Sequence, residues 1–152
     1  MISCTFELNG KTTSQLKCGA HSFPAFSGRR GHTNKPSSAC IVGVGPIPPG
    51  NYYIVDRQTG FAERIFGNSF KENWFALYAV DGEINDEIYC DGERRGEFRL
   101  HPNGPQGISA GCITLEKQED FHTLRAILIS AKKRTLKINN QDMRVYGVIR
   151  VQ

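Results

Sequence analysis

Apolar and polar residues alternate with a period of two in several short stretches of the chain. At the N-terminus Ile2, Cys4, Phe6 and Leu8 alternate with mostly polar neighbours, as in a half-buried strand. Other short runs, rich in β-branched and aromatic residues, also predict strands, at 52–57, 74–80, 87–90, 96–101, 112–115, 135–138 and 144–151. Turn-forming Asp-Gly pairs follow two of these runs, at 81–82 and 91–92.

One segment has the period of a helix instead. Between Glu116 and Lys133 the apolar residues recur at spacings of three and four, at Phe121, Leu124, Ile127, Leu128 and Ala131. Acidic residues near its start and basic residues near its end suit the helix dipole. The sequence therefore predicts a mainly β single domain over residues 1–152, with one long helix in its C-terminal half.

Composition narrows the classes of protein only modestly. The chain has 152 residues, a net charge of +4, 39% hydrophobic and 22% charged residues, which is typical of a globular domain. Its apolar runs are far shorter than the roughly 20 residues of a membrane-spanning helix. The C-terminal basic residues form no stripe interleaved with aromatics, so we expect neither a membrane span nor a nucleic-acid partner.

The N-terminal pattern also bears on localisation. It lacks the continuous apolar stretch and small-residue cleavage site of a secretory signal. This leaves three interpretations: a cytosolic protein, a chain cropped from a precursor, or export by a route that needs no cleavable signal.

The five cysteines are Cys4, Cys18, Cys40, Cys90 and Cys112. No C-x-x-C motif occurs, which argues against a zinc ribbon or a thioredoxin-type site. If one thiol is reactive, the other four can form two bridges in any of three pairings. The alternative is a reduced protein with small buried thiols.

Candidate chemistry is concentrated in residues 101–112, "HPNGPQGISAGC", where His101 precedes Cys112 by eleven positions. A nucleophilic cysteine needs a nearby base and donors for an oxyanion. If the strands around 101 and 112 lie side by side, His101 can reach Cys112, and the flexible Gly111 lets backbone amides face the substrate. The alternative is a surface loop that ends in a buried structural thiol.

This stretch resembles the signature of the L,D-transpeptidase catalytic domain, in which a histidine on one strand precedes a Ser/Thr-His-Gly-Cys strand opening. "IPPGNYYIV" is similar to the family's Thr-Pro-x-Gly-x-Tyr/Phe motif, with Ile47 in place of threonine. With "FPAFSG" and Asn34, the order of motifs resembles a compact subgroup of type VI secretion effectors. Two positions depart from the usual signature: Ala110 replaces its second histidine, and Thr114 replaces a frequent asparagine.

The resemblance implies a β-sandwich-like catalytic domain that needs no cofactor and no metal. It makes Cys112 the nucleophile and His101 its base, with Ser109 orienting His101 or the loop; a structural hydroxyl is the alternative for Ser109. It also implies oxyanion or substrate contacts at Gly111, Ala110, Arg99, Ser27, Gly28 and Asn34. The alternative for Ser27, Gly28 and Asn34 is a role in forming turns. Arg29, Arg30 and Arg99 can meet the carboxylates of a substrate, and the alternative for them is a solvated side chain.

The implied reaction remodels peptidoglycan stem peptides. The Cys112 thiolate attacks the third residue of a tetrapeptide stem and releases D-alanine, and water, a free D-amino acid or a second stem resolves the thioester. The implied effector is delivered by a secretion system, acts in the periplasm of target bacteria and has a cognate immunity protein. Two alternatives are another Cys–His cell-wall peptidase or amidase, and a non-catalytic β-sandwich binding module with a structural Cys112.

Overall fold

The computed structural model describes residues 1–57, 73–104, 111–138 and 140–152. Its strands are β1 (Ile2–Phe6), β2 (Ser14–Cys18), β3 (His21–Phe26), β4 (Gly50–Asp56), β5 (Phe75–Ala79), β6 (Glu87–Cys90), β7 (Glu93–Gly96), β8 (Arg99–Pro102), β9 (Ile113–Leu115), β10 (Arg134–Ile138) and β11 (Gln141–Val151). A short 3₁₀ helix, η1 (Pro36–Ser38), and an α-helix, α2 (Gln118–Ser130), complete the described elements. The predicted mainly β class with a helix in the C-terminal half is confirmed.

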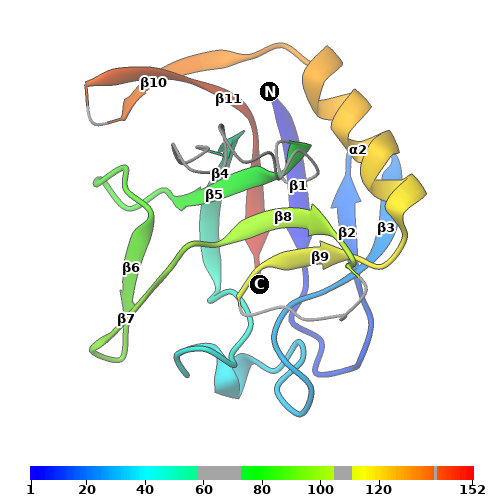
Figure 1. Ribbon diagram of the computed structural model, residues 1–152, viewed down its shortest axis with the longest axis vertical. Helices are drawn as coiled ribbons and strands as arrows, with labels where there is room; N and C mark the ends of the chain where they lie inside the picture. The colour runs from blue at the N-terminus through cyan, green and yellow to red at the C-terminus, as the bar shows by residue number, and fades with distance from the viewer. Residues whose placement is uncertain (58–72, 105–110, 139) are drawn as a thin grey trace, which may run out of the picture.

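Nine strands form one sheet that closes on itself (Figure 1). The order is β1-β2-β3-β9-β8-β5-β4-β11-β10, and a parallel pairing of β1 with β11, the next-to-last strand in this order, closes the sheet. Gly147 of β11 permits this closure, because a Cβ there would lie 2.5 Å from the backbone oxygen of Ile2. The sandwich-like layers expected from the sequence thus belong to a single continuous sheet.

The alternating pattern places apolar side chains inside the sheet. In β2 the burial pattern alternates strictly, with Leu16 and Cys18 buried between exposed neighbours. Leu100, Ile113 and Leu115, from β8 and β9, are fully buried in the same core. Residues that alternate with these three along β8 and β9 therefore point to the opposite face of the sheet.

Helix α2 packs on this core through Phe121, Leu124 and Leu128, and it contacts β8, β9 and β11. The helix ends at Ser130, whereas the sequence periodicity predicted an end at Lys133. Ala131 has an extended backbone conformation, with φ −74° and ψ 159°, and leads into β10. The expectation that basic residues occupy the last helical turn is therefore wrong: Lys132 and Lys133 lie in the connection after the helix, and Arg134 is the first residue of β10, paired with Val145 of β11.

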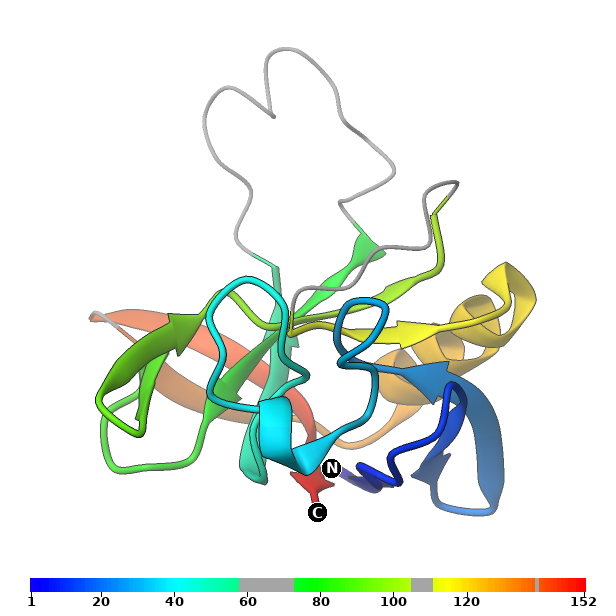
Figure 2. The same ribbon diagram turned by 90° about the horizontal axis from the view of Figure 1, so that it is seen from below.

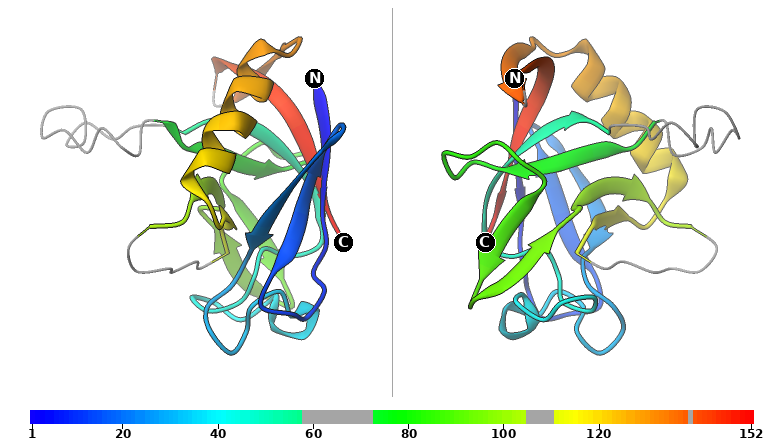
Figure 3. Two further views of the ribbon diagram at one scale, coloured as in Figure 1. Left: turned by 90° about the vertical axis from the view of Figure 1, so that its right-hand side faces the viewer. Right: turned by 60° about the vertical axis from the view of Figure 1, so that its left-hand side comes forward.

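Two peripheral segments lie near the start of β9. Residues 27–49 form loops at the lower end of the molecule in Figure 1, and Figure 2 views them from below. The β6–β7 hairpin forms a separate two-stranded sheet at the side of the closed one (Figure 3). These segments carry several of the residues that surround the candidate site.

Four cysteines are paired in two disulfides, a choice that the sequence left open. Cys4 bonds to Cys18 across β1 and β2, with 4.2 Å between their Cα atoms. Cys40 bonds to Cys90 with 5.1 Å between Cα atoms, and it ties the loop after η1 to β6. Cys112 takes part in neither disulfide.

Candidate active site

The pairing of β8 with β9 brings His101 and Cys112 to one face of the sheet. The strands run parallel, with Leu100 opposite Ile113 and His101 opposite Thr114. Cys112 directly precedes Ile113, so it stands beside Arg99 at the start of the pair. Because side chains alternate along strands, Arg99, His101, Cys112 and Thr114 lie on the face opposite the buried Leu100 and Ile113. The predicted adjacency of the two strands is confirmed.

His101 is held by contacts on its two ring nitrogens and on its ring face. Its Nδ1 lies 2.7 Å from the carbonyl oxygen of Pro102. A carbonyl can only accept, so Nδ1 carries a proton, and when the ring is neutral its lone pair is on Nε2. The Thr114 hydroxyl lies 3.4 Å from Nε2, on the face that Cys112 shares. A neutral histidine in this tautomer is ready to take a proton there.

Trp74 covers the imidazole of His101. The two rings stack with 4.2 Å between centroids and 18° between planes. On the same indole, the Arg57 guanidinium lies 5.9 Å from the ring centroid. The sequence predicted only that Trp74 begins a strand. Its stacking on a residue 27 positions later is non-local and left no signal.

Cys112 is half-buried, and two arginines lie within electrostatic reach of it. Its charge interacts with the guanidinium groups of both Arg95 and Arg99. Positive charge close to a thiol favours the thiolate, which is the nucleophilic form.

Arg95 is a buried arginine that the sequence analysis did not identify. Its Nη1 donates to the carbonyls of Ala39 at 2.6 Å and Pro46 at 2.7 Å, and its Nη2 donates to Gly45 at 3.1 Å. Burial lowers its pKa, and negative charge on Tyr52 and Cys112 acts in the opposite direction. The acceptors lie 49 to 56 positions away in the sequence, so no local pattern could show that this arginine is enclosed.

Gly111 sits directly against this arginine. Its φ is +94°, a conformation that side-chain-bearing residues rarely adopt. A Cβ on Gly111 would lie 2.6 Å from Nη2 of Arg95 and 2.9 Å from the ring of Phe98. The structure thus gives Gly111 a packing role beside Cys112, in the loop where the sequence predicted an oxyanion contact.

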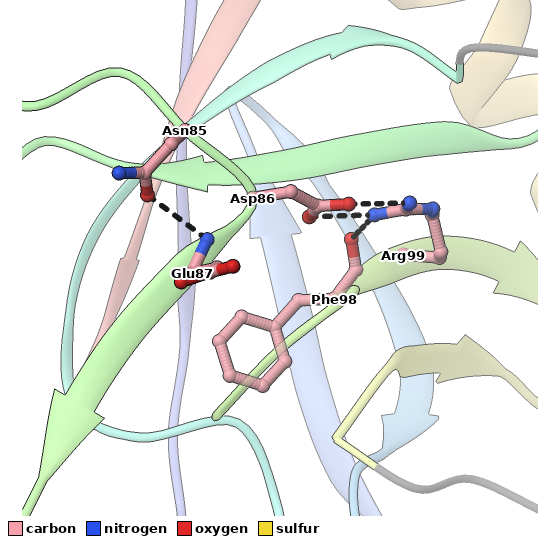
Figure 4. A network of polar contacts seen from close by, with 5 residues as sticks. All are labelled: Asn85, Asp86, Glu87, Phe98 and Arg99. Carbon is pink, nitrogen blue, oxygen red and sulfur yellow. Dashed lines mark hydrogen bonds and ion pairs between the residues drawn. The ribbon is translucent and has the colours of Figure 1, made fainter. Parts of the chain in front are cut away.

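Arg99 forms a two-pronged ion pair with Asp86. Nη1 lies 2.9 Å from one carboxylate oxygen and Nη2 lies 2.7 Å from the other, and Nη1 also donates to the Phe98 carbonyl (Figure 4). Burial works against charge on Arg99, but the hydrogen bond and charge of Asp86, with Tyr78 and Cys112, raise its pKa. A substrate carboxylate at Arg99 stays a prediction, and any such ligand would share the guanidinium with Asp86.

Ser27, Gly28 and Asn34 form a braced turn. Ser27 and Asn34 are fully buried, and the Asn34 amide accepts from the backbone of Ser27 and donates to that of Lys11. The Ser27 hydroxyl accepts from the backbone N–H of Ile47. A Cβ on Gly28 would lie 3.0 Å from Pro46. These contacts favour the turn-forming interpretation for Ser27 and Asn34, whereas Gly28 also borders a hollow.

Ser109 and Ala110 lie outside the described residues, so their predicted contacts stay predictions. Among the residues that the structure describes, no group of three or more His, Cys, Asp or Glu side chains is arranged to hold a metal ion. Within the same ranges, no helix is long and apolar enough to cross a membrane.

The sequence was also compared with known families and proteins. The Tlde1 domain matches residues 21–140, a range that includes His101, Cys112, Arg95 and the braced turn. The chain belongs to the Tlde1 domain family. By its name this is a family of type VI secretion effectors with L,D-transpeptidase activity, so the resemblance noted in the sequence is confirmed at the level of the family. No curated protein and no solved structure gives a significant match.

Proposed function

We propose that this Tlde1 domain is a cysteine-dependent L,D-transpeptidase and L,D-carboxypeptidase that acts on peptidoglycan tetrapeptide stems. The observation that carries the proposal is the parallel pairing of β8 with β9, which sets His101 opposite Thr114, two positions after Cys112. The tautomer of His101, with its proton on Nδ1 toward Pro102, supports its role as a base through Nε2. The family match supports the same class of reaction.

In the proposed first step, His101 takes the proton of the Cys112 thiol at Nε2. The thiolate sulfur then bonds to the carbonyl carbon of the third stem residue. The amide bond to D-alanine breaks, the protonated histidine gives its proton to the departing amine, and a thioester remains on Cys112.

The second step resolves the thioester. Water yields a tripeptide stem, a free D-amino acid yields an exchanged stem, and the amine of another stem yields a cross-link. In each case His101 removes a proton from the incoming group, and the sulfur returns as the thiol. The implied acceptors therefore include D-amino acids as well as peptidoglycan.

The surroundings of Cys112 support the electrostatic side of this mechanism. We assign Arg95 and Arg99 a role in stabilising the thiolate, because both guanidinium groups interact with the Cys112 charge. The backbone N–H groups of Gly111 and Cys112 are the proposed donors to the oxyanion, and Ser109 and Ala110 stay predicted members of the same loop.

The biological setting follows from the family and remains a proposal in its details. We propose that a secretion system delivers the protein, that it acts in the periplasm of target bacteria, and that an immunity protein protects the producing cell. Directing the wild-type protein to the periplasm of a test bacterium should arrest growth, and coexpression of the immunity protein should restore it.

Mass spectrometry of purified disaccharide-tetrapeptide tests the chemistry. Incubation with the protein should remove D-alanine, and excess D-methionine should give the exchanged product. Cys112→Ala should abolish both. Unchanged substrate, with folded protein whose Cys112 reacts with iodoacetamide, would contradict the proposal and favour another Cys–His cell-wall peptidase or amidase. An unreactive Cys112 would favour the binding-module alternative.

A further inference from the structure

A polar hollow of about 500 Å³ lies beyond the ends of β8 and β9. Its wall includes Thr13, Phe26, Gly28, Arg30, Asn103 and Glu116. Neither His101 nor Cys112 lines it, and the mechanism proposed above makes no use of it.

The hollow continues the face that carries the candidate catalytic residues. Phe26 of β3 pairs with Thr114 of β9, which in turn pairs with His101 of β8. Asn103 follows His101 by two positions, and Glu116 follows Thr114 by two. With a rise of about 3.3 Å per residue, Glu116 lies roughly 13 Å along the chain from Cys112. Phe26, which is paired with Thr114, lies about half as far from Cys112 and forms the near wall of the hollow.

The backbone at the far end of the hollow is fixed by hydrogen bonds. The N–H of Asn103 donates to the Leu115 carbonyl at 2.8 Å, and the Glu116 N–H donates to the Pro24 carbonyl at 3.1 Å. These bonds tie the ends of β8 and β9 to each other and to β3, so the polar side chains there extend from a rigid frame.

The side chains of the hollow combine acceptors with a cation. One carboxylate oxygen of Glu116 accepts from the Thr13 hydroxyl at 2.6 Å, and the other oxygen accepts no hydrogen bond from the described residues. The side-chain oxygen of Asn103 is buried, also with no hydrogen-bond partner in the described part of the chain. Arg30, which also lines the hollow, is exposed.

We propose that this hollow is a subsite for an α-amino acid zwitterion, which Glu116 and Asn103 bind by its ammonium group and Arg30 by its carboxylate. This inference rests on the proposed function. A stem whose third residue is a diamino acid such as diaminopimelate carries this group at the end of a three-methylene side chain. With the reacting carbonyl at Cys112, that side chain runs along the face past Thr114 to the hollow.

The same group is present on a free D-amino acid, the second possible source. In the proposed exchange reaction, however, the incoming amine must reach the thioester itself. An ammonium group held at Glu116 is too far along the strand to attack, so we assign the subsite to the donor stem.

Equilibrium binding to Cys112→Ala protein tests the subsite without requiring turnover. Two tetrapeptide stems are titrated, one with meso-diaminopimelate and one with L-lysine at the third position, and Kd is followed by nuclear magnetic resonance. The lysine side chain keeps the ammonium group but lacks the carboxylate. Cys112→Ala should therefore bind the diaminopimelate stem about tenfold more tightly.

Two further substitutions in the Cys112→Ala background separate the halves of the subsite. Glu116→Gln should weaken binding of both stems by about tenfold. Arg30→Gln should weaken binding of the diaminopimelate stem alone, to the level of the lysine stem. Glu119→Gln and Arg29→Gln remove exposed neighbouring charges outside the hollow and should change neither Kd.

The outcomes distinguish this inference from the proposed function. Equal Kd values for both stems in all variants would overturn the subsite, even if wild-type protein releases D-alanine. Selective binding that depends on Glu116 and Arg30, without D-alanine release by the wild-type protein, would support the subsite and contradict the proposed reaction. If Glu116→Gln instead raises KM for D-methionine in exchange and leaves stem binding unchanged, the hollow serves the free amino acid and the assignment to the donor is wrong.

Discussion

The described contacts of the two candidate catalytic residues differ in charge. Those of His101 include three uncharged groups: the Pro102 carbonyl, the Thr114 hydroxyl and the Trp74 ring. Cys112 instead lies within electrostatic reach of Arg95 and Arg99. From this contrast we infer that positive charge around the sulfur activates the nucleophile, and that the Pro102 carbonyl sets the tautomer of the histidine.

Removing the histidine should have the largest effect. We expect His101→Ala to lower kcat for D-alanine release by about 10²–10⁴-fold, because general base catalysis is lost while the cations near Cys112 remain. Mass-spectrometric rate measurement checks this. His32→Ala, which removes a histidine bonded to Ser38, is the control and should remain within twofold. A His101→Ala enzyme with nearly full activity would show that the base lies elsewhere.

A methyl group at Gly111 should disturb the surroundings of Cys112 and leave the contacts of His101 unchanged. Gly111→Ala introduces a Cβ close to Arg95 and Phe98 at a φ of +94°, so we expect a loss of about 1–3 kcal/mol in the free energy of unfolding. We also expect at least about a tenfold loss of activity, because small displacements at a reacting centre are costly. Urea unfolding and D-alanine release measure the two effects.

The matched control for Gly111 is Gly104→Ala, since no atom of the described residues lies within 4 Å of a Cβ at Gly104. Its unfolding free energy should stay within about 0.5 kcal/mol of wild type. Identical behaviour of the two variants would mean that the contact of Gly111 with Arg95 does not constrain the loop.

The charge of Arg95 is tested by the pH dependence of Cys112 alkylation. A nearby cation favours the thiolate, so Arg95→Met should move the midpoint of the alkylation rate upward by about one pH unit. Near neutral pH this is roughly a tenfold slower reaction. Iodoacetamide kinetics across pH 5–10 measure the midpoint.

Arg95→Lys keeps the charge and should restore most of the shift, which a purely structural role for the hydrogen bonds would not predict. Arg94→Met, on the exposed side of the same strand, should leave the midpoint unchanged. If Arg95→Met folds and titrates like wild type, the electrostatic contrast between the two halves of the pair is wrong.

The smallest effect should come from Thr114. Thr114→Val keeps the shape of the side chain but removes the hydroxyl that lies 3.4 Å from Nε2 of His101. We expect kcat to fall about two- to fivefold with little change in KM, because one weak orienting contact is lost. Steady-state kinetics measure both constants, and Thr135→Val on exposed β10 is the control. A loss as large as that of His101→Ala would assign Thr114 a direct role.

The local parts of this arrangement could be predicted from the sequence. Alternation identified the strands around 101 and 112, and the loop between them indicated that they are neighbours, as β8 and β9 are. The exclusion of Cys112 from the bridges was also predicted for a reactive thiol, and the structure agrees.

The non-local parts could not be predicted. Arg95 resembles the solvated Arg94 beside it until three carbonyls from a distant loop enclose its guanidinium. Ser27 and Asn34 suggested substrate contacts because polar loop residues often bind ligands, yet their polar atoms are used by the backbones of Lys11 and Ile47. The choice between two disulfides and a reduced protein likewise depends on which strands meet.

The closure of the sheet determines how much of the chain the chemistry requires. A fragment of residues 21–140 would contain His101, Cys112 and Arg95, but it would lack β1, β2 and β11. Strands β3, β4 and β10 would then lose hydrogen-bonded neighbours. Exposed edges of this kind pair with other chains, so such a fragment should aggregate rather than act. The smallest active unit must therefore include β1 and β11, although neither strand carries a residue of the proposed reaction.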